Sequence, residues 1–286
     1  MNPQKSLILP LCLLLLFISS CTPRLSKEGT KNKPAPAPAK IASLKTNLII
    51  KYQNEQPRLW GEKIPGVLTR LNTKEKVIAL TFDACGGPHG SGYDVRLINF
   101  LIKEQVPATL FINARWIDAN NAVFMALAKN PLFEIENHGF RHLPLSVNGR
   151  SVYGIKGTAG VSEVSDEILL NQRRIEKLTG RKPLFFRSGT AYYDDVALKI
   201  SREMGVKIAG YNVLGDAGAT YTAEQVKKAC LNATPGSIIL LHMNHPEKHT
   251  AEGIIKAVPE LRRQGFSFVK LASQQKNRGA EGSPTK

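Results

Sequence analysis

Short apolar runs alternate with amphipathic stretches through the middle of the chain, and this alternation predicts its secondary structure. The apolar runs have the length and composition of buried strands, at residues 77–82, 108–112, 132–135, 184–186, 206–211, 237–241 and 266–269. Helices are predicted between them, at residues 93–104, 120–129, 162–179, 194–204, 223–231 and 251–264. A βαβα succession of this length predicts an α/β fold with a parallel sheet and outer helices, either closed as a barrel or open. Both arrangements place functional residues at the carboxyl ends of the strands.

The first residues follow a different pattern, which predicts export. A single lysine precedes residues 6–17, which are almost continuously apolar, and Ser19 and Ser20 come directly before Cys21. The apolar run is too short for a membrane-spanning helix, which needs about 20 residues, so we predict a signal peptide over residues 1–20. The Ser-Ser-Cys ending resembles a bacterial lipoprotein processing site, which implies a lipid on Cys21 and attachment to a membrane. A plain secretory signal is the alternative.

Composition sets the remaining boundaries of the chain. Residues 21–40 are rich in Lys, Pro and Ala, which predicts an extended tether behind the lipidated cysteine. Residues 41–76 form an N-terminal extension that we expect to pack on the barrel, and residues 77–272 form the barrel itself. The polar residues 273–286 are predicted to be a flexible tail. Four glycines fall within residues 146–161, which predicts either a lip over the substrate or an ordinary flexible insertion.

Composition and charge narrow the class of protein. Hydrophobic residues make up 42% of the 286 residues and charged residues 22%, which excludes a globally disordered chain. The formal net charge of +16 favours an anionic neighbour such as a membrane surface or an acidic glycan. Export and the lack of a basic, aromatic-rich motif argue against nucleic acid.

The two cysteines in the body of the chain, Cys85 and Cys230, are predicted to be free thiols. Cys85 follows the carboxyl end of a predicted strand, whereas Cys230 ends a helix that leads into the next strand. One strand length, roughly 15 to 20 Å, therefore separates them. A disulfide needs Cα atoms about 4.4 to 6.8 Å apart.

Titratable residues gather at the carboxyl ends of the predicted strands. A lone histidine after a strand is usually structural, but repetition at the ends of several strands favours a functional site. The candidates in chain order are Asp83, His138, His142, Arg187, Asp216 and His242.

The types of these residues predict metal-assisted hydrolysis. His138 and His142 are four positions apart, so a turn of chain can direct both imidazoles at one divalent metal ion. A metal ion held by few protein groups keeps open positions for water and polarises a bound carbonyl. Asp83 can then act as general base, and Arg187 can hold it ionised by charge pairing.

A second acid–base group is predicted on the other side of the ion. His242 can protonate the leaving group, and Asp216 is a plausible partner that orients or charges it. Such a pair around one metal ion indicates a hydrolase of esters or amides.

Taken together, the motifs TFD, H-x-x-x-H, FRSG, an Asp and then LLH, in this order, resemble the polysaccharide deacetylase (NodB-homology) family, carbohydrate esterase family 4. The resemblance covers roughly residues 77–271. It implies a distorted (β/α) barrel of about seven parallel strands, a catalytic divalent metal, most typically zinc, and removal of acetyl groups from N-acetylated sugars. It also implies Asp83 as base, the two histidines His138 and His142 as metal ligands, Arg187 bonded to the base, and His242 as acid.

The chain departs from the family at the third metal ligand. Ala84 stands where the family usually has a second Asp, so an oxygen ligand is missing. Water, substrate or a nearby side chain can complete the coordination, and the candidate side chains are Cys85, His89 and His245. Two smaller departures are Gly139, in place of a hydroxyl residue, and the Ser188-Gly189-Thr190 turn, in place of a proline-containing one.

The leading hypothesis is a metal-dependent deacetylase of an envelope polysaccharide, most plausibly peptidoglycan, because export and anchoring place the chain beside that polymer. A glycan-binding lipoprotein of the same fold that has lost its metal is the alternative from another class. A hydrolase of a different acyl or amide bond is a third reading.

Overall fold

This computed structural model describes residues 38–273 of the chain. The predicted signal peptide, the lipidation site Cys21 and most of the predicted tether lie outside the described residues, as does the predicted tail apart from Ser273. The last three residues of the predicted tether, 38–40, belong to the first helix.

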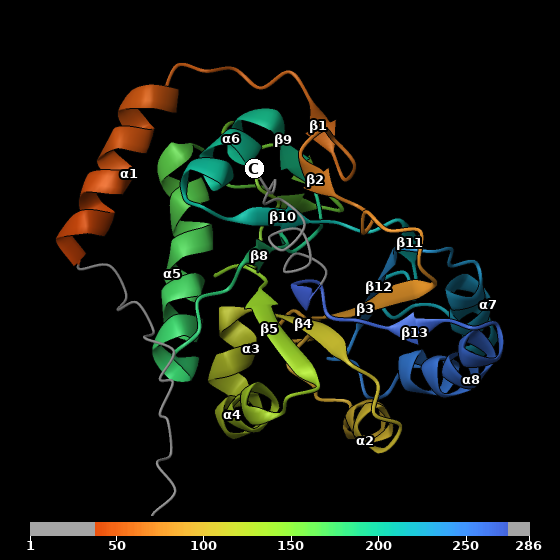
Figure 1. The fold of residues 1–286 in the computed structure, drawn as a ribbon. Helices are drawn as coiled ribbons and strands as arrows, with labels where there is room; N and C mark the ends of the chain where they lie inside the picture. The colour runs from red at the N-terminus through yellow and green to blue at the C-terminus, as the bar shows by residue number, and fades with distance from the viewer. Residues whose placement is uncertain (1–37, 274–286) are drawn as a thin grey trace, which may run out of the picture. The chain divides into compact units, whose positions relative to one another are not determined.

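Nine strands form one sheet with parallel pairings throughout (Figure 1). The strand order is β11-β12-β3-β4-β5-β8-β10-β2, with β13 pairing with β3 outside this path. The α/β fold class, a distorted (β/α) barrel of parallel strands, is thus confirmed. The strands are β2 (Val67–Leu68), β3 (Val77–Ala84), β4 (Ala108–Ile112), β5 (Phe133–Asn137), β8 (Phe185–Phe186), β10 (Lys207–Ala209), β11 (Val213–Leu214), β12 (Ser237–His242) and β13 (Ser267–Phe268).

All seven predicted strands are present, and two short strands join them. β2 pairs with β10 and β11 pairs with β12, each through two residues. Two residues are too few to show a period in the sequence, so neither strand was predictable from alternation. The barrel therefore starts within the N-terminal extension, at β2, and not at residue 77.

Helices cover the sheet, and six of them match the predicted ranges to within two residues (Figure 1). Side-chain caps fix several starts: Asp94 accepts a hydrogen bond from the Leu97 backbone at the start of α2, and Thr222 and Gln225 form a capping box at α7. α1 and α3 were not predicted. The helices are α1 (Pro38–Tyr52), α2 (Val95–Lys103), α3 (Ala114–Ala119), α4 (Asn121–Lys129), α5 (Val161–Thr179), α6 (Asp195–Glu203), α7 (Ala223–Leu231) and α8 (Thr250–Arg263).

The N-terminal extension packs on this framework through α1. Leu48 and Tyr52 of α1 are buried in one apolar cluster with Val164 and Ile168 of α5 and Val196 of α6. Figure 1 shows α1 alongside α5. After α1, β1 (Trp60–Gly61) pairs antiparallel with β9 (Tyr193–Asp194), so the extension also reaches the carboxyl edge of the sheet.

Residues 146–161 contain a small hairpin. β6 (Ser151–Val152) pairs antiparallel with β7 (Ile155–Lys156) across a two-residue turn. Tyr153 and Gly154 both have positive φ in this turn, which is the backbone geometry of the tight turns that match the strand twist.

The central strand β3 is buried on both faces, which explains its continuous apolar run. Ile78, Leu80 and Phe82 lie in the apolar cluster shared with α2 and α8. Residues on the other face alternate with them, and Asp83 falls on that inner face by the two-residue period of a strand. β3 therefore delivers Asp83 to the interior end of the barrel.

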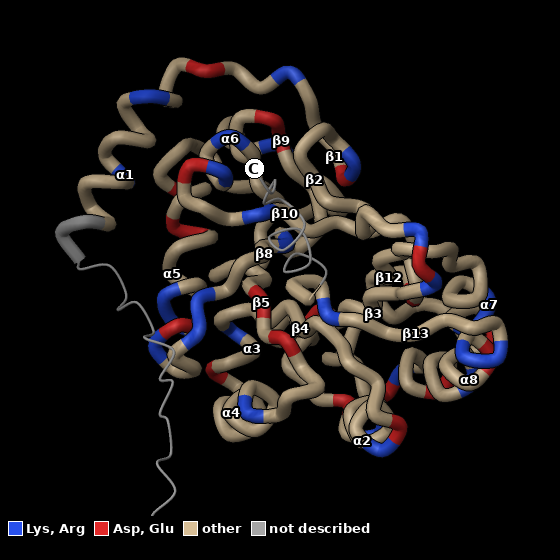
Figure 2. The backbone as a smooth tube through the Cα atoms, in the orientation of Figure 1, with Lys and Arg blue, Asp and Glu red and all other residues tan. Residues whose placement is uncertain are grey.

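The described helices carry both signs of charge. Figure 2 shows Lys and Arg interspersed with Asp and Glu along outer helices such as α5 and α8. Among residues 38–273, no helix combines the length and apolarity needed to cross a bilayer.

Candidate active site

Asp83 and Arg187 form a buried ion pair at the carboxyl ends of β3 and β8. Arg187 is fully buried and Asp83 is 3% exposed. Arg187 Nη1 donates to Asp83 Oδ1 at 2.7 Å, while its other nitrogens donate to the carbonyls of Ala209 (3.2 Å) and Gly210 (3.0 Å). The guanidinium also lies over the Phe111 ring, 4.2 Å from its centroid. Arg187 is thus fixed on every side and holds a negative charge in place at Asp83.

His138 and His142 lie together at the end of β5. Their ring centroids are 4.8 Å apart and the rings are nearly perpendicular, at 83°. His138 Nδ1 donates to the Arg187 carbonyl at 3.0 Å, which leaves the lone pair of Nε2 free. His142 Nε2 is buried and has no hydrogen-bond partner in the described part of the chain. Two ring nitrogens are therefore available as ligands.

Cys85 joins these two histidines. Its Sγ lies 3.8 Å from His138 Nε2, and the ligand atoms of Cys85, His138 and His142 are all within 4.8 Å of one another. The other two candidates for a third ligand are elsewhere: His89 is exposed, and His245 pairs with Glu247. The donor set and the unpartnered His142 nitrogen fit a divalent metal ion.

Charges within the cluster shift the protonation of its members. Burial alone would raise the pKa of the Cys85 thiol, but the charge of His142 and hydrogen bonds with His138 hold it well below its usual range. Burial disfavours the charged form of His138, yet the nearby charges of Asp83 and Cys85 raise its pKa. The group thus favours a thiolate beside imidazoles.

His242 and Asp216 form the second acid–base pair. His242 Nδ1 donates to Asp216 Oδ1 at 2.9 Å, while the His242 backbone (2.7 Å) and the Thr250 hydroxyl (2.8 Å) both donate to Oδ2. Burial opposes a charge on His242, but Asp216 outweighs it and raises the pKa of His242 well above its usual value. Asp216 is fully buried, and the charge of His242 keeps its pKa low. His242 is therefore poised as a proton donor at neutral pH.

Asp83 and His242 open onto one cavity of about 590 Å³. Aromatic side chains form one of its walls: Tyr153 from the β6–β7 hairpin packs on Tyr192, with ring centroids 5.7 Å apart, and Tyr192 packs on Trp60 at 5.6 Å. The lining residues are Glu62, Asp83, Tyr153, Ile155, Gly189, Thr190, Ala191, Tyr192, Tyr211, Leu214, Ala217, Gly218, Leu240 and His242.

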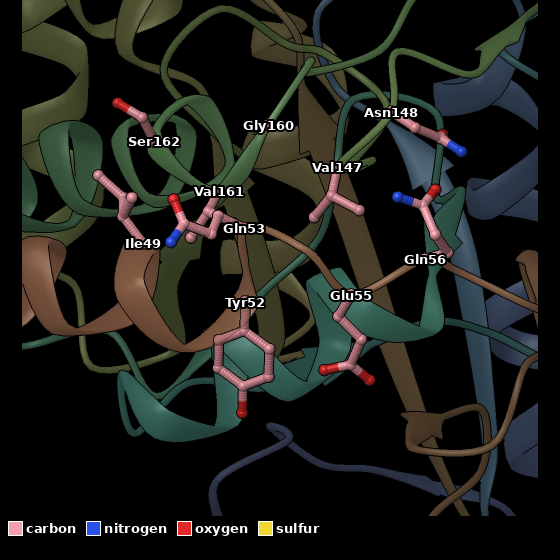
Figure 3. Close-up of a pocket in the computed structure, with 10 residues that line it drawn as sticks. All are labelled: Ile49, Tyr52, Gln53, Glu55, Gln56, Val147, Asn148, Gly160, Val161 and Ser162. Atoms are coloured by element: carbon pink, nitrogen blue, oxygen red, sulfur yellow. The ribbon is translucent and has the colours of Figure 1, made fainter.

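A second hollow lies between α1 and residues 147–162 (Figure 3). Its volume is about 240 Å³, and it shares no lining residue with the larger cavity. Its one carboxylate, Glu55, is paired with Lys199. It therefore lacks the paired acid and base of the larger cavity.

The sequence model of the family described as polysaccharide deacetylase matches residues 70–209. This stretch holds Asp83, Arg187 and the two histidines. Residues 70–209 of this chain belong to the polysaccharide deacetylase family. The family and the class of enzyme predicted from the sequence, a polysaccharide N-deacetylase, are thereby confirmed, whereas the role of each site residue stays a prediction.

Two peptidoglycan deacetylases and one solved structure align with most of this chain. A peptidoglycan-N-acetylmuramic acid deacetylase, PdaA of Bacillus subtilis, is 24% identical over 76% of this chain and 81% of its own. A peptidoglycan-N-acetylglucosamine deacetylase of Bacillus cereus is 27% identical over 72% of this chain and 91% of its own. A solved family 4 pseudoenzyme from Bacillus anthracis has the same fold, with a TM-score of 0.61 and 20% identity over 81% of this chain and 80% of its own.

The two smaller departures of this chain from the family pattern, at Gly139 and Gly189, have local steric reasons. Gly139 has a φ of +82°, and a Cβ there would lie 2.3 Å from Glu167 Oε1. A Cβ on Gly189 would lie 2.3 Å from the His142 carbonyl oxygen. Both glycines therefore let neighbouring groups approach the histidine loop closely.

Glu167 is a supporting residue that sequence reasoning missed. It lies on α5, is 1% exposed, and accepts hydrogen bonds from the backbone of Arg141 (2.9 Å) and Leu143 (3.2 Å). These bonds hold the turn that carries His142, whose φ is +65°. The contacts span 24 to 26 positions, so no local pattern in the sequence marks them.

We expect Glu167→Gln to weaken metal binding because an amide satisfies fewer backbone donors and loosens the His142 turn. Outer positioning residues of metal sites typically contribute about 10- to 100-fold in affinity. Zinc affinity, measured by competition with a chelating dye, is expected to fall by that order. Glu163→Gln, which removes a more exposed carboxylate of the same helix, is the matched control and should leave the affinity unchanged.

Proposed function

We propose that this chain is a metal-dependent deacetylase that removes acetyl groups from N-acetylated sugars of peptidoglycan. One observation carries the proposal: the buried carboxylate of Asp83 opens onto the same cavity as His242, and it lies beside a His, His, Cys donor group, with His138 Nε2 3.7 Å from Asp83 Oδ2. The two named Bacillus relatives act on peptidoglycan sugars, which supports the choice of polymer.

His138 and His142, with Nε2 free on both, would hold the metal ion. When bound, a divalent ion such as zinc supplies Lewis acidity, which polarises the acetyl carbonyl and acidifies water. Arg187 orients Asp83 by bonding to its Oδ1, so that Asp83 Oδ2 can take a proton from the attacking water.

His242 completes the reaction from the other side of the cavity. Its Nδ1 proton is held by Asp216, so Nε2 is the atom that gives a proton to the departing sugar nitrogen. The amide bond between carbon and nitrogen breaks, and acetate and a free amine are the products. Tyr153 and Tyr192, which line the cavity, offer apolar faces on which a sugar ring can pack, and Trp60 packs on Tyr192.

Acetate release tests this proposal. The protein is stripped with chelator, reloaded with zinc and incubated with peptidoglycan, chitin oligomers and simple acetyl esters. We expect acetate from peptidoglycan, loss of release in the stripped protein and recovery on reloading. A protein that binds glycan but binds no metal and releases no acetate would instead be the non-catalytic binding protein. Preference for acetyl esters would indicate a different acyl hydrolase.

The Asp216–His242 pair predicts the alkaline limit of activity. His242 must be protonated to act as acid, so turnover falls as the pH rises through its pKa, which Asp216 raises. In Asp216→Asn the negative charge is gone and the pKa of His242 drops, so the alkaline decline of kcat should begin at lower pH. Asp166→Asn, which removes a surface carboxylate paired with Lys45, should leave the profile unmoved.

We also propose that the chain is exported and anchored to a bacterial envelope membrane by a lipid on Cys21. The signal-like residues 1–20 and the tether composition of residues 21–40 support this placement. Mass spectrometry of the mature N-terminus tests it: a diacylglyceryl mass on Cys21 is expected, and its absence would contradict the anchor.

A further inference from the structure

The metal-binding group contains the sulfur of Cys85. The family that the sequence resembles usually has a carboxylate ligand one residue earlier, where this chain has Ala84. Cys85 follows β3, whereas His138 and His142 follow β5, so the three donors come from two separate segments. Cys230, the other cysteine within residues 38–273, is a free thiol that is fully buried in α7 within an apolar cluster.

Hydrogen bonds hold the backbone on both sides of Cys85, which fixes the direction of its Cα–Cβ bond. The Ala84 carbonyl accepts a hydrogen bond from the Asn113 backbone at 3.0 Å, and the Gly86 backbone donates to the Gly90 carbonyl at 2.8 Å. Gly86 has a φ of +70°, and a Cβ there would lie 2.4 Å from the Trp116 backbone nitrogen. Glycine at position 86 lets the loop approach α3 closely, so Gly86 is a structural requirement of this loop.

A ring nitrogen of each histidine lies close to the Cys85 sulfur. His138 Nε2 lies 3.8 Å from Cys85 Sγ, and His142 Nε2 is buried with no partner in the described part of the chain. A buried polar atom without a partner costs free energy. A metal ion bound by all three atoms would satisfy each of them.

The spacing of the donors fits a small tetrahedral ion. Bonds of about 2.0–2.1 Å to nitrogen and 2.3 Å to sulfur place neighbouring donors about 3.3 to 3.6 Å apart around tetrahedral zinc. The three donor atoms here are within 4.8 Å of one another, and the sulfur and one nitrogen are 3.8 Å apart. Side-chain adjustments of about 1 Å therefore bring all three into range.

We propose that Cys85 Sγ is the third protein ligand of this metal site, which makes it a Cys, His, His centre with an open position. This rests on the proposed metal-dependent function. Ala84, at the position of the family carboxylate, is fully buried in the apolar cluster of Phe82 and Trp116. A thiolate donor favours zinc over oxygen-preferring ions such as Mg²⁺ and Mn²⁺.

Cobalt substitution tests the ligand directly, without substrate. Metal-free protein is titrated with Co²⁺ under a phosphine reductant, and the thiolate-to-cobalt charge-transfer absorption in the near ultraviolet is recorded. We expect the band in the parent protein and in Cys230→Ala, which removes the other thiol. We expect no band in Cys85→Ser, together with a loss of zinc affinity of at least about 10-fold.

Cys85→Asp tests whether another ligand at position 85 can hold the metal ion in place of the thiolate. This variant should bind metal without the charge-transfer band, and its preference for zinc over Mn²⁺ should shrink. A parent protein that binds Co²⁺ without the band, or binds no Co²⁺, would overturn the proposal, as would Cys85→Ser with unchanged band and zinc affinity. If the parent protein shows metal-dependent acetate release but no charge-transfer band, this inference alone is contradicted. If it shows a strong band but releases no acetate, only the proposed function is contradicted.

Discussion

Asp83→Asn is expected to abolish deacetylation while the protein still binds its metal ion. The amide keeps an oxygen for Arg187, whose Nη1 is 2.7 Å from Asp83 Oδ1, but it can no longer accept a proton from water. General base catalysis typically contributes about 10²- to 10⁴-fold, so kcat should fall by that order or more. Acetate release and metal content of the same preparation are the two measurements.

The choice of asparagine matters because Arg187 is fully buried. Removing one partner of a buried ion pair typically costs about 3–5 kcal/mol, so Asp83→Ala would combine lost catalysis with lost stability. Glu62→Gln is the matched control, since Glu62 is another carboxylate that lines the same cavity. Wild-type turnover in Asp83→Asn would eliminate the assignment of Asp83 as base.

His138→Ala and His142→Ala are expected to lose metal and activity together. Each removes a ring nitrogen from a group whose donor atoms lie within 4.8 Å of one another. Because a bound ion stabilises only the folded chain, chelator should lower the Tm of the parent protein but leave that of the variants unchanged. Metal content per chain and Tm with and without chelator are the measurements.

His89→Ala is the control for the histidine variants, because His89 follows the same strand as Cys85 but is exposed. It should retain metal, activity and the chelator-dependent Tm. His138 is 1% exposed, so its replacement also leaves a void, and circular dichroism must show a folded chain. Stoichiometric metal in both ligand variants would rule out this pair as the centre of the site.

The sequence predicted the parts of the site that sit on long, regular strands. β3, β4 and β12 are continuous apolar runs, so their carboxyl ends, and with them Asp83 and His242, could be located from the ends of these runs. The parallel topology then brought the strand ends together. Here the local pattern and the global fold agree, which is why the residues meet as expected.

Features that depend on distant contacts could not be predicted in this way. Glu167 supports the His142 turn from 24 to 26 positions away, and nothing around it in the sequence marks that role. α1 lies mostly in the predicted N-terminal extension and was missed because its residues are only weakly amphipathic. Which of Cys85, His89 and His245 reaches the histidines depends on loop direction, which only coordinates reveal.

The place of β3 at the centre of the sheet has a consequence for how the chain folds. β3 pairs with β12, and the Thr81 hydroxyl donates to the Ile239 carbonyl across 158 positions. The middle of the sheet thus cannot be completed until nearly the whole polypeptide is available, and such long-range pairing slows folding. An incompletely synthesised chain that lacks β12 would therefore leave the edge of β3 that pairs with β12 open.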